Sequence, residues 1–333
     1  MRVALLGAGR IGRLHARLLA EHPDIDTVLI ADPAPHLAAS LADETGAEAA
    51  ADVPAALDHA DAVVIAAATS AHAELVRAAI ARRLPTFCEK PLAPSLDETL
   101  AVRAEIDGSG VPVQIGFQRR FDAGYRAARE KVVTGALGTL YAVRLAGHDP
   151  APPPDAYIPQ SGGLFRDFSI HDFDIVRWVT GLEVEEVYAI GSVRGFPIFA
   201  RYGDVDTASA TLRLEGGVVG AMTIARHDPL GYDIRAELFG SAESVAVGLG
   251  PRTPIESVEP GVPPQAGPPW GDFIDRFHDA YRAEIAAFVA VARGTAPSPC
   301  TATDALAALR IAEAATRSLH EHRPVAVAEI PGA

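Results

Sequence analysis

Three glycines in the run Gly7-Ala8-Gly9-Arg10-Ile11-Gly12 form a G-x-G-x-x-G pattern near the start of the chain. The run follows an apolar, strand-like segment and opens a helix-like one. In this context the first glycine permits a tight turn, the second lets backbone approach a pyrophosphate, and the third allows close packing of helix and strand. The helix N-terminus attracts phosphate. We therefore predict a dinucleotide-binding turn made of Gly7, Gly9, Arg10, Ile11 and Gly12.

Asp32 indicates which dinucleotide this turn binds. It lies 20 residues after Gly12, at the end of the next strand-like segment. A carboxylate at this place accepts hydrogen bonds from a ribose 2′-hydroxyl and repels a 2′-phosphate. NAD is therefore favoured over NADP, a preference that Arg10 or His36 could relax. The alternative is a glycine turn that serves packing alone.

Lys90 is a further candidate for the site. It lies in the segment Thr86-Phe87-Cys88-Glu89-Lys90-Pro91, at the end of another apolar run. The carboxyl ends of strands in doubly wound folds form the ligand crevice, so a lysine there faces the cofactor. A solvated lysine after a strand is the equally simple alternative. Cys88 is expected to be a buried strand residue rather than a nucleophile, because no base lies beside it in sequence.

The order of the motifs resembles the glucose-fructose oxidoreductase and inositol dehydrogenase family, often written Gfo/Idh/MocA. The resemblance covers essentially the whole chain and is greatest for the bacterial inositol 2-dehydrogenases. It is carried by the glycine turn and by four later runs: Glu89-Lys90-Pro91, Gly116-Phe117-Gln118-Arg119-Arg120-Phe121-Asp122, Asp149 to Pro154, and Gly162 to Asp174 with its Ile-His-Asp-Phe-Asp end.

The resemblance implies that Lys90, Asp167 and His171 are catalytic. Histidine titrates near working pH and suits the base that takes a hydroxyl proton while hydride leaves the same carbon. The lysine ammonium would stabilise charge on the oxygen, and the aspartate would orient the imidazole. Two alternatives stay open: Asp167 as the N-cap of the helix that carries His171, and a zinc site of Asp167, His171 and His227. We predict no metal.

Further cofactor and substrate residues are assigned by position. Glu89 and His72 are placed beside the cofactor, although His72 also fits a polar residue at a helix start. A polyol needs several fixed donors and acceptors, so the substrate side is predicted to comprise Arg120, Asp149, Tyr157, Asp172 and Tyr232. Their ordinary alternatives are an Arg120–Asp122 pair, a turn cap at Asp149, and tyrosines in the core.

Three departures from the family pattern concern the cofactor loop and the substrate rim. Ala67 and Ala68 stand where the family commonly has Thr-Pro, so the loop beside the nicotinamide ribose is expected to differ. His148 and Pro159 stand where inositol dehydrogenases often have arginine and lysine. The loss of two cations from the rim puts the identity of the polyol in doubt, but does not affect Lys90, Asp167 or His171.

The elements that must position these residues fall into two patterns. Up to Gln118, short apolar runs alternate with helical periodicity, which predicts a doubly wound parallel sheet. Its strands are expected at Val3–Leu6, Val28–Ala31, Ala62–Ala66, Thr86–Glu89 and Val113–Gly116. Beyond Phe121, successive strands with glycine turns predict a largely antiparallel sheet. The predicted fold is α/β: an N-terminal Rossmann domain (1–118) and a C-terminal α+β substrate and oligomerisation domain (119–333) with a large open sheet.

Composition narrows the class of partner. The net charge of −14 and pI near 5.2 disfavour nucleic acid and anionic membrane surfaces. Apolar runs are far shorter than the roughly 20 residues that span a bilayer. Two cysteines are too few for a disulfide scaffold, which favours a cytoplasmic protein. The expected apolar face of the second sheet suggests self-association, and the resemblance implies a tetramer.

These features together predict an NAD-dependent oxidoreductase whose partner is a small polyol or sugar. The leading hypothesis is oxidation of a ring secondary hydroxyl of a cyclitol, myo-inositol to the 2-keto-inositol. A related sugar or amino-sugar dehydrogenase or reductase is the second. The third is a dinucleotide-binding sensor without turnover, because a fold alone does not guarantee catalysis.

Overall fold

The computed structural model describes residues 1–264 and 266–332, which divide into two compact units. The first unit contains Met1–Gln118 and Asp279–Ala307, and the second contains Arg119–His278 and the chain from Ala308 onward. The division after Gln118 lies where the sequence predicts one, but the segment 279–307 groups with the first unit. That 1–118 and 119–333 are separate folding domains stays a prediction.

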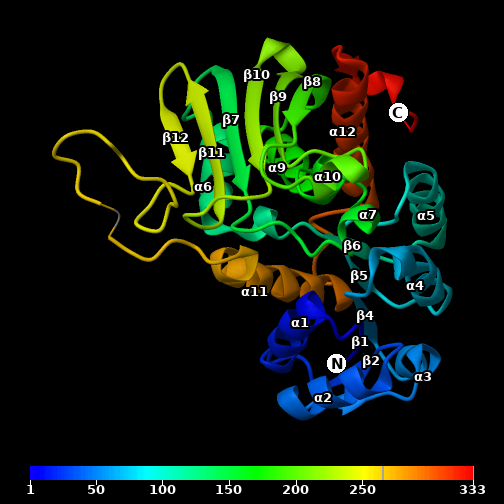
Figure 1. Cartoon of the computed structure of the whole chain (residues 1–333). Helices are drawn as coiled ribbons and strands as arrows, with labels where there is room; N and C mark the ends of the chain where they lie inside the picture. The colour runs from blue at the N-terminus through cyan, green and yellow to red at the C-terminus, as the bar shows by residue number, and fades with distance from the viewer. Residues whose placement is uncertain (265, 333) are drawn as a thin grey trace. The chain divides into compact units, whose positions relative to one another are not determined.

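The first unit is built on a six-stranded parallel sheet with strand order β3-β2-β1-β4-β5-β6 (Figure 1). This confirms the predicted doubly wound sheet. The short, exposed β3 was not predicted, because two residues carry no periodicity. The strands are β1 (Arg2–Leu6), β2 (Thr27–Ala31), β3 (Glu48–Ala49), β4 (Ala62–Ile65), β5 (Thr86–Glu89) and β6 (Val113–Gly116).

Helices connect these strands because their apolar faces need the sheet as a partner. In α1, Leu14, Leu18 and Leu19 recur at helical spacing and are buried. Side chains cap the N-termini of two other helices. Asp52 accepts a hydrogen bond from Ala55 N at the start of α3, and Ser95 accepts one from Glu98 N at the start of α5. The helices are α1 (Arg10–Ala20), α2 (Pro35–Thr45), α3 (Val53–Asp58), α4 (Thr69–Ala81) and α5 (Leu96–Ser109).

The late segment 279–307 belongs to the first unit because it bonds to β6. Ile115 N donates to Cys300 O at 2.9 Å, and Gln114 Nε2 donates to the carbonyl of Glu284 at 3.2 Å. The segment contains most of α11 (Phe273–Ala292), which is kinked at Phe277, and the start of α12 (Ala302–Glu321). The sequence does not predict that this segment returns to the first unit, because more than 160 residues separate the bonded partners.

The second unit is built on a seven-stranded sheet with strand order β12-β11-β7-β10-β9-β8-β13 (Figure 1). The prediction of a largely antiparallel sheet is confirmed, although β7 and β10 pair in parallel. Gly216 and Gly217 turn the chain between β9 and β10 with φ of 72° and 82°. The strands are β7 (Leu140–His148), β8 (Val184–Ser192), β9 (Thr207–Leu214), β10 (Val219–Ala225), β11 (Asp233–Gly240), β12 (Ser244–Val247) and β13 (Val325–Ala326).

One face of this sheet is covered by helices. Tyr125 of α6 and Val176 of α9 pack on Val143 and Leu145 of β7. The Ser318 hydroxyl of α12 accepts a hydrogen bond from Ala189 N of β8. The helices are α6 (Ala123–Val133), α7 (Ile158–Ser161), α8 (Leu164–Asp167), α9 (Ile170–Thr180), α10 (Ile198–Arg201) and the later part of α12, with 3-10 turns η1 (Gln118–Phe121), η2 (Glu215–Gly217) and η3 (Val327–Glu329).

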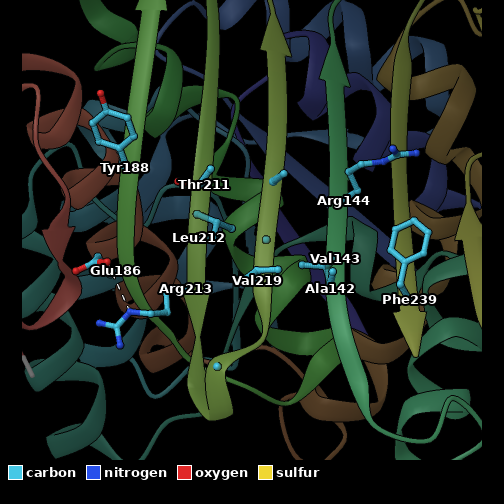
Figure 2. Close-up of a pocket in the computed structure, with 13 residues that line it drawn as sticks. Ala142, Val143, Arg144, Glu186, Tyr188, Thr211, Leu212, Arg213, Val219 and Phe239 are labelled. Atoms are coloured by element: carbon cyan, nitrogen blue, oxygen red, sulfur yellow. Dashed lines mark ion pairs between the residues drawn. The ribbon is translucent and has the colours of Figure 1, made fainter. Parts of the chain in front are cut away.

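Strand residues of the opposite face are exposed. Along β9 and β10 the residues that alternate with the buried ones are exposed or half-buried. Tyr188 of β8 and Val219 of β10 are 39% and 57% exposed. These side chains line a groove of about 500 Å³ that crosses β8, β9, β10 and β7. Figure 2 shows the lining side chains on this face of the sheet. Among the described residues, we find no helix that is both long and apolar enough to cross a membrane.

Candidate active site

The glycine turn between β1 and α1 has the geometry that the motif predicts. Gly7 has φ of 108°, and a Cβ on it would lie 2.6 Å from the Ala66 carbonyl oxygen. A Cβ on Gly12 would overlap the carbonyl oxygen of Gly7. Both positions therefore require glycine, the first for its φ and the second for close packing of α1 on the turn.

The same turn can hold a pyrophosphate. A Cβ on Gly9 would meet no heavy atom within 4 Å, so the space beside this backbone is open. Gly9 is also the N-cap of α1, with no capping side chain and no acidic residue in the first turn. No side chain there competes with an anion for the positive end of the helix dipole. The residues present thus fit a dinucleotide, with Arg10 and Ile11 in the first turn.

Asp32 closes the turn from the end of β2. Its Oδ2 accepts from Ala8 N at 2.8 Å, and its Oδ1 accepts from Ala34 N at 2.8 Å. These bonds hold a half-buried carboxylate beside the turn. Each oxygen keeps a second lone pair for a ribose hydroxyl. His36 lies on exposed α2 surface nearby in sequence.

Glu89 and Lys90 end β5 in different environments. Glu89 is buried, and its Oε1 lies 2.7 Å from Nε2 of His15, which is fully buried on α1. One carboxylate oxygen of Glu89 is thus taken up by His15. The role of Glu89 in cofactor binding stays a prediction. Lys90 is half-buried, and its peptide bond to Pro91 is cis. Cys88 is fully buried, as expected, and burial raises the pKa of its thiol well above the ordinary value.

His72 lies beneath the loop that carries Lys90. Its ring nitrogens face two carbonyls, Nδ1 the Pro91 oxygen at 2.7 Å and Nε2 the Ala67 oxygen at 3.1 Å. Burial lowers the pKa of this imidazole, although both carbonyls favour the protonated ring. The histidine therefore connects the loop that follows β4 with the loop that follows β5. It is a buried residue that holds these two loops together, not a polar residue at a helix start.

Asp167 and His171 lie on two separate helices of the second unit. Asp167 is the last residue of α8, and His171 is the second residue of α9. The N-cap of α9 is Ser169, so the reading of Asp167 as that cap is wrong. Phe168 and Ser169 separate the two helices, since α8 ends at Asp167 and α9 begins at Ile170.

The Asp167 carboxylate is held on both oxygens. Oδ1 accepts from the Tyr157 hydroxyl at 2.9 Å, and Oδ2 lies 2.9 Å from Nη2 of Arg226. Nη1 of Arg226 also lies 3.5 Å from Oδ2 of Asp149. The structure thus brings together three predicted site residues, Asp149, Tyr157 and Asp167, around an arginine that sequence analysis missed. Arg226 is 3% exposed in its side chain.

Two buried arginine–aspartate pairs join η1 to α9. Arg120 donates to both oxygens of Asp174, at 2.8 and 2.5 Å, so the alternative pairing with Asp122 is wrong. Arg119 pairs with Asp172. Burial raises the pKa of the Asp172 carboxyl, and Arg119 opposes this shift without cancelling it. The predicted substrate residues Arg120 and Asp172 are therefore engaged within the protein.

Tyr232 is a core residue. It lies 5% exposed, and its ring packs edge-on against Phe277 with centroids 6.4 Å apart. Burial raises the pKa of its hydroxyl, an effect that nearby Arg119 reduces. The core alternative for this tyrosine is therefore the one that the structure shows. Tyr157, by contrast, is exposed at 42%.

A cluster of His148, Asp228 and Asp233 places one ligand atom of each residue within 4.8 Å of the others. His148 Nδ1 lies 3.6 Å from both carboxylates, and Arg235 donates twice to Asp233 at 2.8 and 2.9 Å. The guanidinium competes with a cation for Asp233. In the described part of the chain, Asp167, His171 and His227 form no such group.

Comparison with known proteins gives matches along most of the chain. Residues 1–117 match the model of an oxidoreductase family with an NAD-binding Rossmann fold, and residues 125–246 match the GFO/IDH/MocA C-terminal domain. Myo-inositol dehydrogenase Hyg17 of Streptomyces leeuwenhoekii is 41% identical over 96% of this chain and 97% of its own. Myo-inositol 2-dehydrogenase of Thermotoga maritima is 35% identical, and the match covers 100% of both chains.

Solved structures agree. Scyllo-inositol dehydrogenase from Lactobacillus casei, crystallised with NAD(H) and scyllo-inositol, superposes with a TM-score of 0.88 at 27% identity. That match covers 98% of this chain and 99% of the other. Family models for both units, relatives over nearly full length and the shared architecture lead to one conclusion: the chain belongs to the GFO/IDH/MocA family of oxidoreductases, with an NAD-binding Rossmann fold.

Proposed function

We propose that the protein oxidises a ring secondary hydroxyl of a cyclitol, converting myo-inositol to the 2-keto-inositol with NAD. The observation that carries this proposal is the similarity of nearly the entire chain to inositol dehydrogenases, at up to 41% identity. The glycine turn and Asp32 support it independently, because they fit an unphosphorylated ribose.

The proposed chemistry divides between three residues. NAD, when bound, supplies the hydride acceptor. His171 takes the hydroxyl proton as the substrate carbon loses hydride, and Lys90 stabilises the negative charge that develops on the oxygen. Asp167, which Tyr157 and Arg226 hold in place, is assigned the role of orienting the His171 imidazole.

The substrate side of the proposal separates into two groups. Asp149 and Tyr157 stand beside Asp167 and are proposed to contact the polyol. Arg120, Asp172 and Tyr232 are at most 5% exposed, so we assign them a supporting role beneath the site instead of direct contact. Buried ion pairs such as Arg120–Asp174 and Arg119–Asp172 hold the segments that carry them in place.

A panel of cyclitols and sugars, assayed with NAD and with NADP separately, tests this function. We expect NADH formation with myo-inositol or another cyclitol at higher kcat/KM than with any open sugar. Preference for a sugar or amino sugar would replace the cyclitol with the related substrate class. NADH binding without turnover on any member of the panel would leave only the sensor function.

We also infer a cytoplasmic homotetramer. The exposed face of the second unit's sheet supports self-association, since Tyr188 and Val219 are open on it (Figure 2). Cys88 and Cys300 are both buried and form no disulfide, which suits a reducing compartment. Light scattering after size exclusion measures the subunit number, and fractionation of cells measures the location.

A further inference from the structure

The catalytic proposal uses Arg226 only as a partner of Asp167 and does not explain its second contact, with Asp149. Arg226 directly follows β10, and its main-chain N donates to the Asp206 carbonyl at 2.8 Å, so its backbone is fixed. Its guanidinium carbon lies 5.9 Å from the centroid of the Phe168 ring. The Arg226 side chain is 3% exposed, so its charge has lost most of its hydration. Nearby carboxylates must offset the free energy of this desolvation.

Two carboxylates share this guanidinium. Nη2 lies 2.9 Å from Asp167, and Nη1 lies 3.5 Å from Asp149. Burial by itself lowers the pKa of Arg226. The net shift is nevertheless upward, because the guanidinium interacts with the carboxylates of Asp167, Asp149 and Asp204. The two η nitrogens therefore contact different segments. Nη1 faces Asp149, which follows β7, and Nη2 faces Asp167 at the end of α8.

We propose that Arg226 is a positioning residue for the dehydrogenase reaction: its forked guanidinium holds the carboxylates of Asp149 and Asp167 side by side, both ionised. This inference rests on the proposed function for its kinetic part only. In that form both aspartates act purely as hydrogen-bond acceptors, Asp149 toward substrate hydroxyls and Asp167 toward the cationic imidazole that proton transfer creates.

The geometry explains why arginine is needed. A lysine ammonium is a single point charge and cannot present two nitrogens to two acids in a fixed plane. Without any cation, the two carboxylates would face each other in a partly buried site, and like charges favour protonation of one of them. The charged groups that act on the Arg226 guanidinium are Asp167, Asp149 and Asp204, and Asp167 also accepts a hydrogen bond from the Tyr157 hydroxyl.

The first experiment needs no substrate. Urea midpoints of the wild type and Arg226→Gln are compared between pH 5 and pH 8. We expect the deficit of the variant to grow with pH, because above the ordinary carboxyl range it must bury two uncompensated carboxylates, whereas at lower pH one is protonated. Arg226→Gln with Asp167→Asn should recover much of the deficit at pH 8. A deficit that is independent of pH and unchanged in the double variant would overturn the proposal.

The second experiment is kinetic. Arg226→Gln should lower kcat at pH 7 by about tenfold or more and add a second ionisation to the pH profile, with NADH binding unchanged. Arg226→Lys should restore the wild-type shape of the profile but only part of kcat. Arg177→Gln, which breaks the Arg177–Glu183 pair at the far end of α9, is the matched control and should keep profile and kcat.

The two experiments separate the possible failures. A wild-type protein that turns over no polyol would refute the proposed function, while the unfolding series would still decide whether Arg226 holds ionised carboxylates. Conversely, an active enzyme whose Arg226→Gln variant keeps the wild-type pH profile and kcat per folded molecule would overturn the positioning role alone.

Discussion

Asp32 combines two roles in one carboxylate, because it closes the glycine turn and faces the predicted ribose position. Asp32→Ser should erode the preference for NAD over NADP by about 1–3 kcal/mol, through loss of a charge-assisted hydrogen bond and of repulsion toward a 2′-phosphate. Steady-state kcat/KM with both cofactors measures the change. Thermal unfolding of the variant controls for the lost bonds to Ala8 and Ala34. Equal efficiency of the unmutated protein with NADP would contradict this role.

Lys90 is separated from a merely structural lysine by removing only its charge. Lys90→Met keeps the side-chain length, and electrostatic stabilisation of the oxygen predicts a fall in kcat of roughly 10²–10³. Cofactor affinity, measured by NADH fluorescence, and thermal stability should change little. Lys131→Met removes an exposed lysine paired with Glu243 and should be neutral. Early melting with normal turnover per folded molecule would make Lys90 structural.

His171 must be neutral to accept a proton, so oxidative activity should rise with pH across the histidine range. His171→Ala should lower kcat by about 10²-fold or more and leave NAD binding nearly unchanged. His320→Ala, on the exposed end of α12, is the control. Full kcat in His171→Ala would remove this residue from the mechanism.

At the scale of elements, the turn between β1 and α1 separates a packing glycine from a binding glycine. Gly12→Ala places a methyl group against the Gly7 carbonyl and should cost about 1–3 kcal/mol of unfolding free energy. Gly9→Ala enters open space, so its stability should stay within about 0.5 kcal/mol while NADH affinity falls. Urea unfolding and NADH titration measure both. Unchanged stability in Gly12→Ala would refute the packing role.

Elements also decide how far periodicity is informative. All five strands predicted before Gln118 are present, because each is a short and mostly apolar run whose residues are nearly all buried. The second sheet is recognisable through alternation, as in β9, where Ala208, Ala210, Leu212 and Leu214 are the buried residues. Local pattern does not encode strand order, so the parallel pairing of β7 with β10 was not predictable.

For the whole molecule, the exposed sheet face tests self-association. Val219→Glu places a charge on that face, where Val219 is 57% exposed, and should reduce the mass measured by light scattering. Val133→Glu, at 71% exposure on α6, is the matched control and should leave the mass unchanged. A monomeric wild-type protein would remove the basis of this prediction.

The sequence by itself determined the family, the Rossmann sheet and the glycine turn with Asp32. These depend on short-range spacing, in which every partner lies within one β-α-β unit and the chemistry follows from residue type. Lys90, Asp167 and His171 were identified by resemblance, and their roles stay predictions.

Only the tertiary structure decided which partners these residues have. Asp167 meets Arg226, Arg120 meets Asp174, and Glu89 meets His15, pairs separated by 54 to 74 residues. Charge complementarity alone does not choose among the 29 basic and 43 acidic residues of the chain. The choice follows from strand order and helix placement, because a buried charge is stable only beside the opposite charge that the fold brings within hydrogen-bonding distance.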